Sequence, residues 1–289
     1  MNKKRNIVSI IMNCYNGEKF INSSVNSVLQ QTYKNWELIF WDNNSKDNSA
    51  KILKKFNDKR IKYFYSPIHE KLYRARNQAI KKSNGKYISF LDVDDTWEKD
   101  KLKIQINKII KTKSDIIYSN HWIMKNKKKR KFKKTNFSFL NLFEEMLLDY
   151  PISILTVIMR SDIFKSKNYK FDERYEIIGD FDLFYRLCNN FKFLYVHKPL
   201  ATYNIHNDNL SKKKLLSEIN EFNYWIKKNK NILNNFDNSI IEKNNIRICE
   251  YFLSKNRLGF FSKEIKKIKN YKIRYKIYLK VFLKKIRII

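Results

Sequence analysis

The sequence predicts an α/β fold with a Rossmann-like, mostly parallel sheet flanked by helices and a helical, basic C-terminal extension. Two observations carry this prediction. Short apolar runs rich in β-branched residues alternate with segments of helical periodicity through the first half of the chain, and strands that alternate with helices form mostly parallel sheets covered on both faces. From about Leu210 onward, the pattern is helical and rich in lysine.

The elements follow one another in a regular order. The predicted strands share β-branched and aromatic residues and are the segments NIVSIIMNC, WELIFW, IKYFYS, KYISFLDVDD, DIIYSNHWIM, SILTVIMRS and KFLYVHKPLATYNIH. The predicted helices share apolar residues at helical spacing and cover residues 18–32, 50–56, 72–83, 99–113, 136–150 and 177–190. A further helix is expected after SILTVIMRS, and the basic run from Lys125 to Lys134 is expected to form a solvated hairpin or loop.

Length and composition indicate a folded protein with a strong positive charge. The 289 residues, 43% of them hydrophobic and 15% aromatic, suffice for one large domain or two small ones. Lys and Arg number 61 against 28 Asp and Glu, which gives a formal charge of +33. Such a charge favours anionic partners, but the joint excess of Lys, Asn and Ile is also what an AT-rich genome produces. Both explanations stay open.

Cysteine content and hydropathy favour a cytoplasmic protein. Cys14, Cys188 and Cys249 are odd in number and far apart, which suggests neither a disulfide framework nor a zinc knuckle. The apolar run from Ile7 to Met12 is too short for the core of a signal peptide. No stretch reaches the roughly 18 apolar residues that a membrane span requires.

Acidic residues gather where the strand KYISFL ends, at Asp92, Asp94 and Asp95. Ligands of such sheets bind at the carboxyl ends of the strands, and Mn²⁺ or Mg²⁺ relieves the repulsion between neighbouring carboxylates while sharing oxygen ligands with phosphates. A metal–diphosphate site is one explanation. The other is a capped turn, in which Asp95 or Thr96 caps a helix that begins near Trp97. Taken alone, the cluster leaves both open.

The same letters also fit the DxDxT pattern of haloacid-dehalogenase-like phosphohydrolases. Asp92 would then be the nucleophile and Asp94 the acid/base. That pattern needs a later acidic pair near a Gly-Asp, and the segment from Gly179 to Asp182 comes close but has the wrong spacing. The motif also normally opens its domain, whereas here three strand–turn–helix units precede it. A phosphohydrolase is therefore the alternative function.

Ordered segments of the chain resemble family 2 glycosyltransferases with the GT-A fold. The matching parts are the strand and Tyr-Asn turn of VSIIMNCYNG, the helix end SVLQQTY, the strand WELIFWD with its Ser-containing loop, the helical ARNQA, the cluster DVDD, and the segments IIGDFDLFYRL and ATYNIHNDNLS. The resemblance covers about residues 6–211. It implies a GT-A catalytic domain over 1–211, with a nucleotide-sugar half at about 1–100 and an acceptor half at about 101–211, followed by a helical basic region over 212–289.

The resemblance implies an inverting, metal-assisted glycosyltransferase. It would move a sugar from a nucleoside diphosphate sugar to a hydroxyl of a glycan or a lipid-linked acceptor, in the synthesis of cell-surface polysaccharide or lipooligosaccharide. The expected cofactor is Mn²⁺ or Mg²⁺. Nucleic acid is not expected as a partner, because the chain lacks a recognisable nucleic-acid motif and acidic clusters at strand ends oppose phosphate binding without a metal.

For the donor, the resemblance implies residues at the strand ends and on the helix over 72–83. They are Asn13, Tyr15, Asn16, Asp42, Asn43, Arg76, Asn77 and Asp92. Tyr15 is expected to stack on the base, Arg76 to pair with the diphosphate, and Asn77 to brace the donor loop. The family often has a second Asp where this chain has Asn43, which leaves the identity of the base open.

For the metal, the resemblance implies Asp94, with Asp95 in support and His206 reaching the cation or the diphosphate. An isolated His is as often a packing or surface residue, so both roles stay open for His206.

For the catalytic base, the resemblance implies Asp180, with Asp182 as the second candidate, because Gly179 stands where the family usually has Glu. Both carboxylates lie at the start of a predicted helix, where the helix dipole favours an acid in any case. Helix capping is therefore the competing explanation for both of them.

The C-terminal tail from Lys263 to Ile289 contains eleven Lys or Arg and a single acid, Glu264. Apolar residues recur among them at mixed helical spacings. Such a segment suits peripheral contact with an anionic membrane surface on the inner face of the cell membrane. The alternative is a helix that packs back on the catalytic domain.

Overall fold

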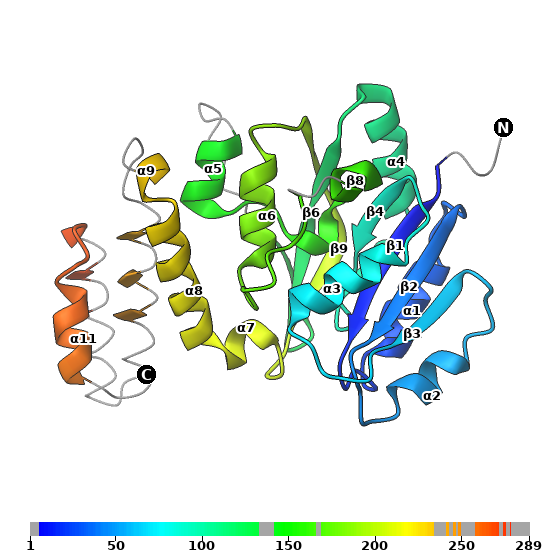
Figure 1. Ribbon diagram of the computed structural model, residues 1–289, viewed down its shortest axis with the longest axis horizontal. Coiled ribbons are helices and arrows are strands. Elements are labelled where there is room, and N and C mark those ends of the chain that lie inside the picture. The colour runs from blue at the N-terminus through cyan, green and yellow to red at the C-terminus, as the bar shows by residue number, and fades with distance from the viewer. Residues whose placement is uncertain are drawn as a thin grey trace. The chain divides into compact units, whose positions relative to one another are not determined.

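The computed structural model describes residues 6–132, 142–165, 169–233 and 258–271, together with residues 241–242, 245–246, 248–249, 274–275 and 278. The chain forms two compact units, Met1–Asn209 and Leu210–Ile289 (Figure 1). The sheet belongs to the first unit, and the described part of the second is helical.

The first four strands form a parallel sheet in the order β3-β2-β1-β4. These strands are β1 (Val8–Cys14), β2 (Trp36–Asp42), β3 (Ile61–Tyr65) and β4 (Tyr87–Phe90). The helices that connect them are α1 (Ile21–Leu29), α2 (Ser49–Lys54) and α3 (Leu72–Lys81). Every residue of β1, β2 and β4 is buried, because helices cover both faces of the sheet and leave neither face exposed to solvent. The predicted α/β architecture is confirmed.

The later strands make the other half of the sheet mixed. They are β5 (Thr96–Trp97), β6 (Ile116–Lys125), β7 (Lys128–Lys131), β8 (Ile158–Arg160) and β9 (Phe193–Ile205). Among the described residues, the order continues as β4-β8-β6-β9-β5, and β7 pairs with β6. β6 and β9 are parallel, whereas β8 is antiparallel to both β4 and β6. The parallel prediction therefore holds for the first four strands and for β6 with β9.

The two faces of the sheet carry different helices. Alternate residues of β1, such as Val8 and Met12, pack in one core with α1, α2 and α4 (Lys101–Thr112). The opposite face carries α3, whose Arg76 guanidinium lies 5.7 Å from the ring centroids of both Phe90 in β4 and Phe171. The carboxyl ends of β1, β2 and β4 thus lie between the helices that cover the two faces of the sheet.

The helix predicted over 99–113 is present as α4, but the prediction that it begins near Trp97 is wrong. Thr96 and Trp97 instead form β5, which pairs with Thr202 and Ala201 of β9, and α4 begins at Lys101. Tertiary contacts hold this segment extended, because the Trp97 indole donates to the Leu155 carbonyl at 2.9 Å. The proposed capping of that helix by Asp95 or Thr96 is therefore also wrong.

The segment SILTVIMRS is only partly a strand. The 3-10 helix η1 (Ile154–Thr156) precedes β8, and the helix expected after it is the 3-10 helix η2 (Ser161–Lys165). α5 (Leu142–Asp149) lies within the helix predicted over 136–150, whose first six residues are outside the described part of the chain. The basic run forms a hairpin, since β7 pairs with the end of β6; Lys133 and Lys134 lie outside the described residues.

The remaining elements are helices, one in the first unit and the others in the second. α6 (Gly179–Leu187) confirms the helix expected from the segment IIGDFDLFYRL. In the second unit, the helices are α7 (Leu210–Lys213), α8 (Leu215–Lys228), α9 (Lys230–Leu233) and α11 (Leu258–Ile265). Within the described residues, none of the helices has both the length and the apolar character needed to cross a bilayer.

Gly85 makes a close approach that tests this fold. A Cβ atom there would lie 2.6 Å from the Ser9 hydroxyl and 2.7 Å from the Ile7 carbonyl oxygen. Because backbone atoms of β1 cannot move away independently, we expect Gly85→Ala to lower the free energy of unfolding by about 1–3 kcal/mol, measured by urea denaturation. The exposed neighbour offers a control, Asn84→Ala, which should change stability by no more than about 0.5 kcal/mol. Equal stability of the two variants would contradict the packing at this turn.

Candidate active site

A buried ion pair joins α3 to the loop after β4. The Arg76 side chain is 2% exposed, and its Nη2 donates to Asp92 Oδ1 at 2.5 Å. Burial acts to lower the pKa of Arg76, but Asp92, Tyr73 and Asp180 raise it above its ordinary value, so the guanidinium stays charged. The ring of Tyr73 and those of Phe90 and Phe171 surround it at 5.5 to 5.7 Å. Arg76 and Asp92, both predicted from the sequence, are thus brought together.

Asp94 meets His206 across the loop between β4 and the end of β9. His206 Nε2 lies 2.8 Å from Asp94 Oδ2, and the Asn209 amide donates to the same oxygen at 3.1 Å. Burial and the nearby Asp92 raise the pKa of Asp94, and His206 opposes that shift. The His206 ring also packs on Phe20, with centroids 4.6 Å apart. The structure therefore assembles a carboxylate and an imidazole, two of the three residues expected at the metal.

The third, Asp95, points elsewhere. Its side chain is 2% exposed, and Oδ1 accepts a hydrogen bond of 2.8 Å from the Asn204 backbone N–H of β9. Burial and Asp94 raise the pKa of Asp95 well above its ordinary value. Within the described part of the chain, no three His, Cys, Asp or Glu side chains are arranged to hold a metal ion. A cation here would take Asp94 and His206 from the protein and its remaining ligands from the substrate. The carboxylate suits Mn²⁺ or Mg²⁺, and the imidazole nitrogen favours Mn²⁺ of the two.

The end of β1 offers an unpaired amide and an exposed ring. Among the described residues, neither side-chain atom of the buried Asn13 has a hydrogen-bond partner. Tyr15 is 49% exposed, and its ring lies against His69, with centroids 4.0 Å apart and planes tilted by 46°. Asn16, by contrast, links two loops, because its Oδ1 accepts from the Lys46 N–H at 2.8 Å. Tyr15 is therefore the exposed member of this predicted trio, and Asn13 is the member whose buried amide has no partner among the described residues.

The two residues at the end of β2 are engaged by the protein itself. Asp42, 1% exposed, accepts 2.8 Å hydrogen bonds from the Ser45 N–H and the Tyr63 hydroxyl. The Asn43 amide pairs with the backbone of Glu70: Oδ1 accepts from its N–H at 3.0 Å, and Nδ2 donates to its carbonyl at 2.8 Å. This pairing fixes the loop between β3 and α3. It thereby places His69 against Tyr15.

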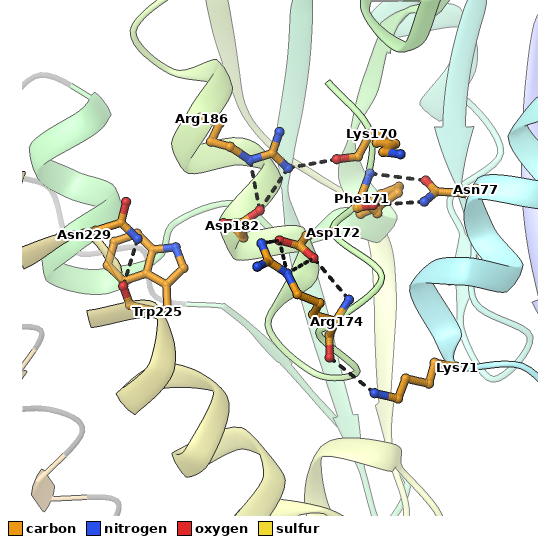
Figure 2. A network of polar contacts seen from close by, with 10 residues as sticks. All are labelled: Lys71, Asn77, Lys170, Phe171, Asp172, Arg174, Asp182, Arg186, Trp225 and Asn229. Carbon is orange, nitrogen blue, oxygen red and sulfur yellow. Dashed lines mark hydrogen bonds and ion pairs between the residues drawn. The ribbon is translucent and has the colours of Figure 1, made fainter. Parts of the chain in front are cut away.

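Asn77 braces a segment on the other side of α3. Its side-chain amide bonds both the N–H and the carbonyl of Phe171, at 3.2 and 2.9 Å (Figure 2). The same amide also donates to Glu173 at 3.1 Å. The role expected for Asn77 was to brace the donor loop. The segment that it holds is instead the one that leads into α6.

The two candidate bases differ sharply. Asp182 is 2% exposed and ion-paired with Arg186 at 2.9 Å, and Arg186 also donates to the Lys170 carbonyl (Figure 2). Asp180 faces α3 instead: the Tyr150 hydroxyl donates to its Oδ2 at 2.7 Å, and the Tyr73 hydroxyl lies 3.0 Å from its Oδ1. Burial raises the pKa of Asp180, while Tyr150, Arg76 and Tyr73 act to lower it. Asp180, which shares an electrostatic environment with Arg76 and Asp92, is the better placed of the two.

Several residues of the site were not predicted from the sequence. They are Phe20, Tyr63, His69, Glu70, Tyr73, Tyr150 and Asn209. Tyr73 and Asn209 stand within three residues of predicted members, in LYRARN and NIHNDN, which is a usable signal. Tyr150 has none, because only the fold of the chain between β7 and β8 brings it to Asp180.

The amide pairing of Asn43 gives a direct structural test. Asn43→Asp keeps an acceptor for the Glu70 N–H but sets a carboxylate oxygen against the Glu70 carbonyl, because Asp has no amide donor. We expect faster hydrogen exchange of the loop around Glu70, by about tenfold for a loss of about 1.4 kcal/mol. Asn44→Asp adds the same charge next door without touching Glu70 and is the control. Unchanged exchange in Asn43→Asp would contradict the clamp.

Comparison with known proteins places the chain in a family. It matches the family model described as Glycosyl transferase family 2 over residues 9–177. It is 42% identical over 120 residues to the Escherichia coli UDP-Glc:alpha-D-GlcNAc-diphosphoundecaprenol beta-1,3-glucosyltransferase WfgD, a match covering 42% of this chain and 47% of WfgD. A Haemophilus influenzae protein, an uncharacterized glycosyltransferase, is 30% identical over 243 residues, or 78% of this chain and 89% of its own length. The match to WfgD thus spans about half of that relative.

Another relative and two solved structures are also similar. The Bacillus subtilis glycosyltransferase TuaG, named for teichuronic acid biosynthesis, is 34% identical over 41% of this chain and 48% of its own length. S. aureus TarS with UDP-GlcNAc superposes with a TM-score of 0.61 at 18% identity, over 92% of this chain and 91% of TarS. Mannosyltransferase PcManGT from Pyrobaculum calidifontis, with GDP-Man and Mn²⁺, gives 0.60 at 11% identity, over 97% of this chain and 88% of its own. At these identities the two structures show a shared fold. The family match and the Haemophilus relative together identify this chain as a member of glycosyl transferase family 2, and hence as a glycosyltransferase.

Proposed function

We propose that this glycosyltransferase is an inverting, metal-assisted enzyme that transfers a sugar from a UDP-sugar to a hydroxyl of a lipid-linked glycan in bacterial surface-polysaccharide synthesis. The observation that carries the proposal is the convergence of the Arg76–Asp92 pair, the Asp94–His206 pair and Asp180 around the carboxyl ends of the parallel strands. Membership of the family replaces the phosphohydrolase alternative. Since the family match ends at residue 177, the roles of Asp180 and His206 rest on their geometry.

The base site suits a uracil-like edge. A side-chain amide has both a donor and an acceptor, and the edge of uracil presents an N–H beside a carbonyl. Both amide atoms of Asn13 are buried and have no partner among the residues that the structure describes, which costs about 1–3 kcal/mol that a bound ligand would recover. The Tyr15 ring beside it offers a face for stacking. The relatives WfgD, named for UDP-Glc, and TarS, solved with UDP-GlcNAc, favour the same nucleotide.

Asp94 and His206 would hold the divalent cation. When bound, the ion supplies positive charge that stabilises the departing nucleoside diphosphate. Asn209 keeps the Asp94 carboxylate oriented toward His206, and Phe20 supports the imidazole ring from the other side. Arg76 holds Asp92 through Oδ1. In the part of the chain that the structure describes, Asp92 Oδ2 has no hydrogen-bond partner, so it can accept a hydroxyl of the ribose or sugar.

Asp180 is the proposed base. The acceptor oxygen attacks the anomeric carbon as the bond from that carbon to the diphosphate oxygen breaks, and the hydroxyl proton passes to the Asp180 carboxylate. A single displacement of this kind inverts the anomeric centre. Asp180 lies in the first turn of α6, and the basic residue of that helix is Arg186 in its last turn. Because Arg186 pairs with Asp182, the charge of Asp180 stays available for the proton transfer.

A lipid-linked acceptor would be met at a membrane surface. WfgD is named for a diphosphoundecaprenol acceptor, and the segment from Lys263 to Ile289 carries eleven basic residues. Of that segment, the structure describes Lys263 to Tyr271 and three later residues, with Lys266, Lys267 and Lys269 exposed. We propose that these lysines contact anionic headgroups.

The metal site is tested by turnover. We expect the purified protein to transfer sugar from one member of a UDP-sugar panel, UDP-Glc first, to a GlcNAc-diphospholipid, and to lose activity with EDTA and regain it with Mn²⁺. Asp94→Asn should lower kcat/KM by about 100-fold or more, since it removes several kcal/mol of charge stabilisation. Asp162→Asn is the matched control, because Asp162 pairs with Arg160 at the opposite end of β4. Full activity in Asp94→Asn, or in EDTA, would contradict a metal-assisted reaction.

The membrane contact is tested with vesicles. A triple reversal, Lys266→Glu with Lys267→Glu and Lys269→Glu, should weaken binding to phosphatidylglycerol vesicles by at least about 100-fold, at about 1 kcal/mol per basic residue. The same reversal of exposed lysines in the β6–β7 hairpin, at Lys127, Lys128 and Lys131, is the control and should have a smaller effect. Equal losses in both variants would show a general charge effect and overturn the role of the tail.

A further inference from the structure

We infer that Tyr150 and Tyr73 are positioning residues that hold the Asp180 carboxylate ionised and leave its Oδ2 open toward the acceptor hydroxyl. This inference rests on the proposed function, in which Asp180 is the base. Tyr73 comes from α3, and Tyr150 follows α5. Two phenols from separate parts of the chain therefore converge on one carboxylate.

The contacts divide the two oxygens of Asp180 unequally. Oδ1 is within hydrogen-bond distance of two donors, the Tyr73 hydroxyl at 3.0 Å and the Phe181 backbone N–H at 2.9 Å. Within the described residues, Oδ2 accepts from the Tyr150 hydroxyl alone, at 2.7 Å. A carboxylate has about four lone-pair sites, so Oδ2 keeps one for an incoming hydroxyl. Oδ2 is thus the atom that receives the proton.

Tyr150 is the stronger of the two donors. The Tyr73 hydroxyl also lies 2.8 Å from the Ile177 carbonyl oxygen, and its single hydrogen is shared between that oxygen and Asp180. The Tyr150 hydroxyl has its contact with Asp180 at the shorter distance. Its ring is fixed edge-on against Phe181, with centroids 5.4 Å apart.

The Tyr73 ring can approach Asp180 because Gly179 has no side chain. A Cβ atom on Gly179 would lie 2.5 to 2.8 Å from three carbons of the Tyr73 ring, which is closer than carbon atoms can approach. Any other residue at this position would push the ring away from Asp180. Gly179 therefore contributes to the same arrangement, because it leaves the space that the Tyr73 ring occupies.

The charges around Asp180 give the arrangement a chemical consequence. Burial raises the pKa of the carboxyl, and the donors Tyr150, Tyr73 and the Phe181 N–H, together with the Arg76 guanidinium, oppose that rise. These are the groups that face Asp180 from α3, from the segment after α5 and from α6 itself. A donor to the charged form favours that form, so its removal raises the pKa further. The base would then become protonated, and inactive, at a higher pH.

The experiment compares pH profiles. In Tyr150→Phe, the acid limb of kcat/KM should move upward by about one pH unit, because a hydrogen bond to a charged group contributes about 1.5 kcal/mol or more, while the plateau changes little. Tyr73→Phe and Gly179→Ala should move it in the same direction by less. Tyr33→Phe is the control: it also loses a phenolic hydrogen bond, to the Asn6 carbonyl, and Tyr33 is not among the groups that shift the pKa of Asp180. An acid limb that stays in place in Tyr150→Phe, in a protein that folds and turns over, overturns the inference.

A second readout separates this inference from the proposed function. The carboxyl carbon of Asp180, identified by its absence in Asp180→Asn, can be titrated by ¹³C NMR without any substrate. An upward shift of that titration in Tyr150→Phe supports the positioning role, even where wild-type protein transfers no sugar and the proposed function fails. An unshifted titration overturns the positioning role even where the enzyme is active.

Discussion

One buried guanidinium holds the two sides of the site together. Arg76 is enclosed by the rings of Tyr73, Phe90 and Phe171 and pairs with Asp92 at the end of β4. A charge in such surroundings is stable only when it is paired, and removal of one partner of a buried pair typically costs about 3–5 kcal/mol. Because Arg76 also lies in the field of Asp180, the same cation fixes the carboxylate of the donor side and favours the ionised form of the proposed base. α3 is thus the element that links the donor and acceptor sides.

The neighbouring loops are fixed by polar contacts of the protein with itself. Asn43 is paired with the backbone of Glu70, and Asp95 with that of Asn204. These contacts satisfy buried groups and set the loop positions, and Asn13, Tyr15, Asp94 and His206 are the groups proposed to contact a ligand. The division has a physical reason: a polar group saturated by backbone partners has no free donor or acceptor to offer.

The sequence predicted the fold well where local patterns decide it. Apolar runs such as VSIIM became buried parallel strands, and helices such as α1 follow the stripe of Ile21, Val25 and Val28. It failed where distant contacts decide: Thr96 and Trp97 are extended because β9 pairs with them, and β8 is reversed by its place between β4 and β6. In the site, the motif residues Arg76, Asp92 and Asp94 gather at the strand ends, but Arg76, for which the sequence predicted a diphosphate partner, is buried and pairs with Asp92. Asp95 and Asn43 hydrogen-bond backbone groups far along the chain, which their local sequence does not reveal, and Tyr150 carried no local signal.

The central claim is that one cation, one arginine-held carboxylate and one base surround the reacting sugar. A crystal structure with Mn²⁺ and an intact, non-hydrolysable UDP-sugar tests it most directly, with anomalous scattering to place the metal. The account predicts a manganese peak bonded to Asp94 and His206, the Arg76–Asp92 pair intact beside the ribose or sugar, and Asp180 Oδ2 on the face of the anomeric carbon opposite the diphosphate. A manganese peak away from Asp94, or a donor bound with Asp180 on the same face as its diphosphate, would contradict it.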